Sequence, residues 1–214
     1  MALKACIFDL DGTLLDTLED LATSANSALA ACGLPTRSRE DIRSFVGNGV
    51  RVLMRRALPE ETDADTAQKA YEAFLDIYAR NKAQTTKPYE GIISMLEALH
   101  ARGLQLAVLS NKDDAAVAAL CAQYFPDIFA LTQGMRDGVR PKPAPDTLLS
   151  LCARLGVAPD EVIYIGDSEV DVQTARAADM RLIAVTWGFR SRQTLLEAGA
   201  QTFAEKPMDV LALV

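Results

Sequence analysis

Two aspartates, Asp9 and Asp11, follow the short apolar run Ala5–Phe8 near the start of this 214-residue chain, and Gly12 and Thr13 come next. A short, continuously apolar run of this kind is typical of a buried strand in a parallel sheet. Ligands of open α/β sheets bind beyond the carboxyl ends of the strands, so both carboxylates are expected at a binding site. The residues also fit an ordinary Asp-Gly turn. A calcium loop fits less well, because the later oxygen ligands of an EF-hand are missing.

A second acidic segment, residues 166–171 (Gly-Asp-Ser-Glu-Val-Asp), follows the apolar run 162–165. Asp167 and Asp171 are four residues apart and share a face if a helix begins there. Asp167 or Ser168 could simply cap that helix, and Asp171 could be a favourable acid in its first turn. Four carboxylates at one sheet edge would repel one another unless a cation lay among them. Because oxygen ligands suit a hard divalent ion, Mg²⁺ is the predicted cofactor.

Residues suited to binding a phosphate occur at two further places. Ser110 and Asn111 follow the apolar run 106–109, where the start of a helix would add backbone N–H groups. Taken alone, they also fit a plain helix cap. Lys142 has a proline on each side, which stiffens its backbone, although most lysines are solvated loop residues. An ion, a lysine, a hydroxyl and an amide together predict a site for a small phosphorylated metabolite.

The composition limits the partners of the chain. It has 22 basic and 29 acidic residues, a formal net charge of −7, so its bulk charge does not attract nucleic acid or an anionic membrane. No apolar run reaches the ~18 residues of a membrane span, and the N-terminus does not resemble a signal peptide. Four scattered cysteines suggest buried thiols in a reducing compartment. We expect a cytoplasmic protein with no obligate protein partner.

Apolar runs alternate with helical patterns over most of the chain, which predicts a parallel α/β sheet. The expected strands are 5–8, 106–109, 162–165 and 182–185. Residues 15–87 differ, because their apolar positions recur at helical spacing and no strand is evident. The simplest architecture is a core of residues 1–14 and 88–214 with a helical domain, residues 15–87, inserted in the first crossover.

Three helix starts are expected from the positions of capping residues. Thr17 and Asp20 match a capping box ahead of the first inserted helix. Ser38 carries a similar signal for a later helix, and Asp146 can cap the helix that follows Lys142.

In these motifs and their order, the chain resembles the haloacid dehalogenase-like superfamily of phosphohydrolases. The resemblance spans nearly the whole chain and is carried by Asp9-Leu10-Asp11-Gly12-Thr13, Ser110-Asn111, Lys142 and residues 166–171. It implies an α/β fold, namely a Rossmann-like parallel-sheet core with an inserted small α-helical cap domain. It also implies a Mg²⁺-dependent phosphatase of small phosphate monoesters, most similar to the phosphoglycolate phosphatases.

The resemblance implies roles for the motif residues. Asp9 would be the nucleophile that forms an aspartyl-phosphate, and Asp11 would protonate the leaving oxygen and then activate water. Asp9, the backbone carbonyl of Asp11, and Asp167 would hold Mg²⁺, with Asp171 supporting the metal. The residues expected to bind the phosphoryl oxygens are Ser110, Asn111 and Lys142.

Within the inserted domain, residues 45–51 resemble the cap loop of phosphoglycolate phosphatases. The residues expected to set substrate specificity there are Gly47, Asn48, Gly49 and Arg51. Arg51 could bind the carboxylate of phosphoglycolate, with Arg55 and Arg56 as competing candidates. The segment also fits an ordinary helix–helix turn.

Other functions fit the sequence less well. A dehalogenase of this superfamily would lack the second aspartate, and a mutase would carry a histidine in the cap, whereas the single histidine is His100. A receiver module lacks a helical insertion and is shorter. A pyrophosphatase, another sugar-phosphate or nucleotide phosphatase, and a non-catalytic phosphate-binding relative remain as alternatives.

Overall fold

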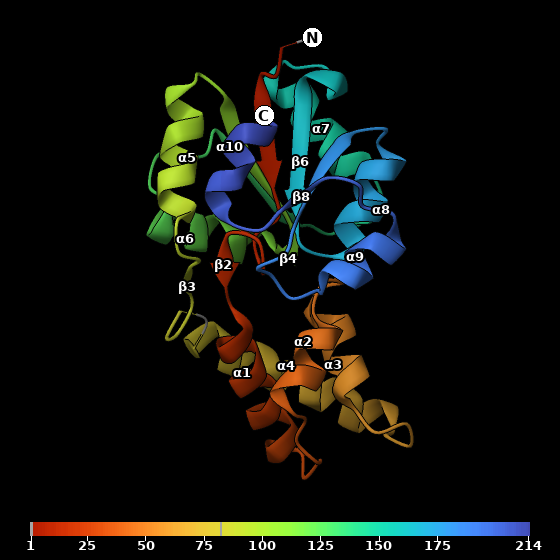
Figure 1. Ribbon diagram of the computed structural model, residues 1–214. Helices are drawn as coiled ribbons and strands as arrows, with labels where there is room; N and C mark the ends of the chain where they lie inside the picture. The colour runs from red at the N-terminus through yellow and green to blue at the C-terminus, as the bar shows by residue number, and fades with distance from the viewer. Residues whose placement is uncertain (1, 82) are drawn as a thin grey trace. The chain divides into compact units, whose positions relative to one another are not determined.

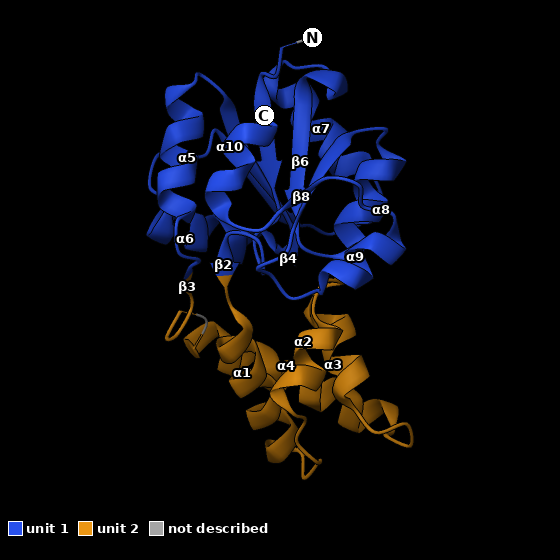
Figure 2. Cartoon of the chain, viewed as in Figure 1, with its two compact units in different colours: residues 1–15, 88–214 blue, residues 16–87 orange. Residues whose placement is uncertain are grey.

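The computed structural model describes residues 2–81 and 83–214 and divides the chain into two compact units (Figure 2). The sheet unit comprises residues 1–15 and 88–214, and the helical unit comprises residues 16–87. Two short strands, β2 (Leu15–Asp16) and β3 (Lys87–Pro88), pair where the chain passes between the units. The expectation of no strand within 15–87 is therefore wrong at its two ends, because two-residue strands carry no recognisable pattern.

The sheet unit is built on a six-stranded sheet whose paired neighbours all run parallel. In spatial order the strands are β5 (Leu131–Met135), β4 (Gln105–Asp113), β1 (Ala5–Phe8), β6 (Val162–Gly166), β7 (Arg181–Val185) and β8 (Phe203–Ala204). This is the order of a doubly wound fold, and the predicted α/β class is confirmed. The chain extends the sheet on one side of β1 and then continues on the other side, so the order reverses between β1 and β6. Ligands of such sheets bind at this reversal.

Helices cover both faces of the sheet (Figure 1). They are α5 (Ile92–Ala101), α6 (Asp114–Tyr124), α7 (Asp146–Leu155), α8 (Glu169–Ala177), α9 (Arg192–Ala198) and the short α10 (Val210–Leu213). In the figure α5, α6 and α10 lie on one side, and α7, α8 and α9 on the other. Two single 3₁₀ turns, 159–161 and 207–209, complete the unit. No helix of the described chain is long and apolar enough to cross a bilayer.

The alternation of side chains along β1 divides the core between the two faces. Ala5 and Ile7 belong to the same buried cluster as Leu148 and Leu151 of α7. Cys6 and Phe8, also fully buried, point to the opposite face. All four cysteines are free thiols, and three of them are buried, whereas Cys32 is half-buried. Because β1 is covered on both faces, its sequence is continuously apolar, as predicted.

The helical unit contains α1 (Leu18–Ala31), α2 (Arg39–Phe45), α3 (Val50–Ala57) and α4 (Ala64–Asn81). The longest helices, α1 and α4, pack against each other. On α4, the buried rings of Phe74 and Tyr78 stack with their centroids 5.4 Å apart. The Ser38 cap is confirmed. The Ser38 hydroxyl accepts from the backbone N–H of Asp41, and the Asp41 carboxylate accepts from the backbone N–H of Ser38.

Two of the predicted caps are wrong. The Thr17 side chain makes no capping hydrogen bond, because its expected partner Asp20 is turned toward the residues that precede β3. Asp146 is the first residue of α7 rather than its cap, and its carboxylate pairs with Arg140 at 2.7 Å. In both cases the acid pairs with a residue outside its own helix instead.

Asp20 joins the two ends of the helical unit. Its carboxylate accepts from the backbone N–H and the hydroxyl of both Thr85 and Thr86, at 2.6 to 3.2 Å. Burial acts to raise the pKa of Asp20, but the bonds from Thr86 and Thr85 outweigh it and hold the pKa below its usual value. The ionised carboxylate therefore stabilises the unit.

We expect Asp20→Asn to lower the free energy of unfolding by about 1–3 kcal/mol at neutral pH, because the amide loses acceptors and turns a donor toward N–H groups. The lowered pKa means that this stabilisation is present above the unfolded-state pKa and is lost as the pH falls through the folded-state pKa. Urea unfolding at neutral and acidic pH measures both effects. Asp76→Asn, at an exposed site on α4, is the control. Equal stability of the two variants at neutral pH would contradict the prediction.

Candidate active site

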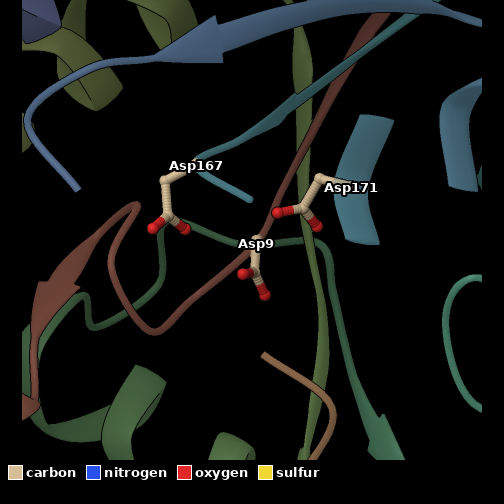
Figure 3. Close-up of side chains that lie close together, drawn as sticks. All are labelled: Asp9, Asp167 and Asp171. Carbon is tan, nitrogen blue, oxygen red and sulfur yellow. The ribbon is translucent and has the colours of Figure 1, made fainter. Parts of the chain in front are cut away.

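Three buried aspartates meet where the order of strands reverses (Figure 3). Asp9 is the first residue after β1, Asp167 is the first after β6, and Asp171 lies in the first turn of α8. One carboxylate oxygen from each lies within 4.8 Å of the others. The structure therefore brings together three of the four predicted acids, on segments that are far apart in the sequence.

Lys142 is a cation that contacts two of these aspartates. Its Nζ lies 2.9 Å from Oδ1 of Asp9 and 2.7 Å from Oδ1 of Asp171. It also donates to the hydroxyl of Tyr164 at 2.9 Å, and that hydroxyl donates to Oδ1 of Asp171 at 2.7 Å. Lys142 is 5% exposed, so it is a buried ion-pair partner rather than a solvated loop residue.

Asp171 is held on both of its oxygens. While Oδ1 accepts from Lys142 and Tyr164, Oδ2 accepts from the hydroxyl of Ser168 at 2.6 Å and from its backbone N–H at 3.1 Å. The Ser168 hydroxyl accepts in turn from the backbone N–H of Asp171, which makes the pair a capping box at the start of α8. The capping interpretation of this segment is thus correct, and Asp171 faces the cluster as well.

Asp167 is fixed by the loops after β1 and β7. Its Oδ1 accepts from the hydroxyl of Thr13 at 3.1 Å, and its Oδ2 accepts from the backbone N–H of Phe189 at 2.7 Å. Gly12 and Gly188 pack so closely against the carboxyl group that a Cβ at either position would collide with it. Gly12 also has a φ of +89°, which only glycine adopts readily. The glycine that suggested a turn is needed here for close approach to Asp167.

The charges in this cluster are unequal, with three carboxylates around one ammonium. Burial raises the pKa of Asp9 well above its usual value, although Lys142 opposes this, and burial raises the pKa of Asp167 to about 7. Burial alone would lower the pKa of Lys142, but Asp171 and Asp9 raise it. Burial likewise opposes the ionised form of Asp171, yet Lys142 holds its pKa below the usual value. A second cation among these oxygens would relieve the remaining repulsion.

Ser110 and Asn111 lie on β4, which extends further than the predicted strand. Asn111 donates to the backbone carbonyl of Lys142 at 3.0 Å and accepts from its backbone N–H at 2.9 Å. The Ser110 hydroxyl accepts from the backbone N–H of Lys112 at 3.2 Å. The interpretation of Ser110 and Asn111 as a helix cap is wrong, because the side chain of Asp113 caps α6. Asn111 instead fixes the segment that carries Lys142.

Sequence reasoning missed Lys112 and Tyr164. Lys112 Nζ lies 2.9 Å from both carboxylate oxygens of Asp11, so the fourth predicted acid is paired with this lysine and is not in the three-aspartate cluster. Lys112 directly follows the polar pair Ser110 and Asn111, and no local pattern marks it as a buried ion-pair partner. Tyr164 lies inside an apolar strand, where a tyrosine is expected to be a core residue.

Comparisons with known proteins identify the family of the chain. Residues 6–185 match the family model described as haloacid dehalogenase-like hydrolase. The chain belongs to this family. It is 37% identical to the phosphoglycolate phosphatase of Chromobacterium violaceum, over 90% of this chain and 89% of that one. It is 33% identical to phosphoglycolate phosphatase 1 of Pseudomonas aeruginosa, over 97% and 78%. A crystal structure of a candidate phosphoglycolate phosphatase from Lactobacillus delbrueckii subsp. bulgaricus superposes with a TM-score of 0.93 at 36% identity, covering 98% and 97% of the two chains.

The predicted specificity residues of this haloacid dehalogenase-like hydrolase lie in the helical unit. Gly47, Asn48 and Gly49 link α2 to α3, and both glycines have positive φ, 123° and 82°. Arg51, in the first turn of α3, places its guanidinium 4.0 Å from the centre of the Tyr71 ring on α4. Its planar group is thus stacked on an aromatic face.

We expect Lys142→Met to lower the free energy of unfolding by about 3–5 kcal/mol at neutral pH in excess chelator, because Asp9 and Asp171 are left buried without their cation. Acidification protonates these carboxylates, so the deficit should shrink as the pH falls. Urea unfolding across this pH range is the measurement, with the exposed Lys206→Met as the control. A deficit that stays constant with pH would mean that lost packing, rather than lost charge, destabilises the variant.

Proposed function

We propose that this chain is a Mg²⁺-dependent phosphatase that hydrolyses small phosphate monoesters through an aspartyl-phosphate on Asp9, with phosphoglycolate as its foremost substrate. The observation that carries the proposal is the place of Asp9, at the carboxyl end of the central strand, in contact with Lys142 and close to the carboxylates of Asp167 and Asp171. The names of the relatives at 33–37% identity support the substrate class.

The chemistry proceeds in two displacements. A carboxylate oxygen of Asp9 attacks the phosphorus, the bond to the ester oxygen breaks, and Asp11 gives that oxygen a proton. Water then attacks the phosphorus of the aspartyl-phosphate, Asp11 takes a proton from it, and phosphate leaves with Asp9 restored. Each displacement reverses the protonation state of Asp11, so the acid returns to its starting form after every turnover.

The residues of the cluster fit a divalent ion. Its donors are buried carboxylate oxygens, which Mg²⁺ prefers, and one lysine does not neutralise the three acids. Asp9, Asp167 and the backbone carbonyl of Asp11 would hold the ion, and Asp171, which is saturated with hydrogen bonds, would support it. The bound ion supplies positive charge that offsets the charge of the phosphoryl oxygens.

Three further residues are proposed to bind the phosphoryl group. Lys142 touches the nucleophile and remains a cation, so it can also pair with a phosphoryl oxygen next to Asp9. Ser110 and Asn111 come from the neighbouring strand β4, and both are buried. Such positioning and charge stabilisation provide most of the catalysis in phosphoryl transfer.

The helical unit is proposed to be the cap that selects the substrate. The linker of Gly47, Asn48 and Gly49 permits close backbone approach to a ligand, and Arg51 offers a guanidinium to the carboxylate of phosphoglycolate. A pyrophosphatase or another sugar-phosphate or nucleotide phosphatase would use the same sheet unit with different cap contacts.

Phosphate release from a panel that contains 2-phosphoglycolate, pyrophosphate, sugar phosphates and nucleotides tests the proposal, with Mg²⁺ and with chelator. Metal-dependent release that favours 2-phosphoglycolate supports it. A strong preference for another member of the panel would change the proposed substrate but not the proposed chemistry. No release from any member would contradict the proposed function.

Asp9→Asn should lower phosphate release by roughly 10³-fold or more, because an amide is a poor nucleophile for phosphorus. The fold should survive, since the side chain keeps its size. The assay uses the best substrate of the panel, and far-UV circular dichroism checks the fold. Asp146→Asn, at a surface ion pair, is the matched control with an unchanged rate. Near wild-type turnover by Asp9→Asn would assign the nucleophile elsewhere.

Mg²⁺ activation should weaken as the pH falls through about 7. The pKa of Asp167 is raised to about 7, and a proton on that carboxylate competes with the ion. The Mg²⁺ concentration for half-maximal activity should rise by at least about tenfold per pH unit below this value, since Asp9, whose pKa is also raised, can bind a second competing proton. Asp167→Ala should require far more Mg²⁺ at every pH. An Mg²⁺ titration of Asp167→Ala that matches wild type would remove Asp167 from the metal site.

A further inference from the structure

Lys112 forms an ion pair with Asp11 that the proposed chemistry does not explain. Its Nζ lies 2.9 Å from Oδ1 and 2.9 Å from Oδ2 of the same carboxylate. The side chains are 4% and 13% exposed, so the pair is largely screened from water. Burial of an unpaired ammonium destabilises a fold, so a lysine is favourable at this position only when a partner such as Asp11 pairs with it.

The backbone of β4 around Lys112 directs its side chain toward Asp11. The pairing of β4 with β5 is regular up to Leu109 and shifts register before Asp113, so the irregularity spans the segment that contains Lys112. Irregularities of this kind re-aim side chains near active sites. The hydroxyl of Ser110 accepts from the backbone N–H of Lys112 and steadies the segment.

The two aspartates of the Asp9-Leu10-Asp11 motif thus pair with two different lysines. Lys142 contacts Asp9 and Asp171, whereas Lys112 contacts both oxygens of Asp11. A carboxylate held on both oxygens by one cation has little freedom to rotate. The contact therefore defines where the Asp11 carboxylate lies, two residues beyond the proposed nucleophile.

We infer that Lys112 is a positioning residue that orients the Asp11 carboxylate for proton exchange with the leaving oxygen and with water. The inference rests on the proposed function, because it assigns Asp11 the proton transfer of both displacements. Lys112 acts through Asp11 and binds neither the phosphoryl group nor the rest of the substrate. Its removal should therefore matter most where the leaving oxygen needs a proton.

The test compares an alkyl phosphate, 2-phosphoglycolate or the best alkyl ester of the panel, with p-nitrophenyl phosphate, whose leaving group departs without protonation. General acid–base catalysis contributes roughly 10²–10⁴-fold, so misplacing the acid should cost a sizeable part of this factor. Lys112→Met should lower kcat for the alkyl ester by about tenfold or more, with KM changed less than about twofold. With p-nitrophenyl phosphate, the first-turnover release of p-nitrophenolate reports the first displacement alone, and its loss should be several times smaller.

Two further variants separate positioning from simple structural damage. Lys112→Arg keeps the charge and can still contact both oxygens, so it should recover part of kcat, and it also serves if Lys112→Met does not fold. In an Asp11→Asn background, Lys112→Met should cause no additional loss, because its partner is already gone. Lys206→Met is the matched control at an exposed site.

Each result decides the inference. A rise in KM with unchanged kcat would make Lys112 a substrate-binding residue and overturn it. An equal loss in the first-turnover release of p-nitrophenolate, or an undiminished loss in the Asp11→Asn background, would also overturn it. Wild-type hydrolysis in the same assay shows that such a failure concerns Lys112 alone. A wild-type protein inactive on every ester would instead overturn the proposed function and the inference together.

Discussion

Three buried carboxylates around one buried ammonium are the constraint on which the sheet unit depends. Asp9, Asp167 and Asp171 have oxygens within 4.8 Å of one another, and Lys142 touches two of them. Such a concentration of charge opposes folding unless every remaining oxygen finds a donor. The surrounding residues supply donors to the oxygens of Asp167 and Asp171, namely Thr13, Tyr164, Ser168 and the backbone N–H of Phe189. These hydrogen bonds accordingly hold the loops at this sheet edge in place.

Structural and functional interpretations of the same residue prove compatible at this edge. Asp171 is a helix-capping acid and also a partner of Lys142, because its two oxygens face in different directions. Gly12 belongs to a turn and also leaves room for the Asp167 carboxyl group. A site built at strand ends must satisfy helix termini and hold charged groups with few residues, so one side chain serves both purposes.

The parts of the structure that could be predicted are those with a continuous local pattern. β1 and β6 are covered on both faces, so their apolar runs were found within one residue of the observed bounds. β5 contains Thr132, Gln133 and Gly134 and has no apolar run, so it was missed. The prediction of a Thr17 cap is wrong because Asp20 accepts hydrogen bonds from Thr85 and Thr86, more than sixty residues later. Lys112 and Tyr164 were missed because nothing local tells a buried polar partner from a loop lysine or a core tyrosine.

The loop between β1 and β2 explains how the site keeps its geometry next to a large insertion. Backbone N–H groups of Leu14 and Leu15 donate to the carbonyl of Leu10, and the Trp187 indole donates to the carbonyl of Thr13 at 3.0 Å. The chain enters the helical unit directly after this loop. Because these bonds lie within the sheet unit, the positions of Asp9 and Asp11 do not depend on the sequence of the insertion. Residues 16–87 can therefore change without disturbing the carboxylates of Asp9 and Asp11.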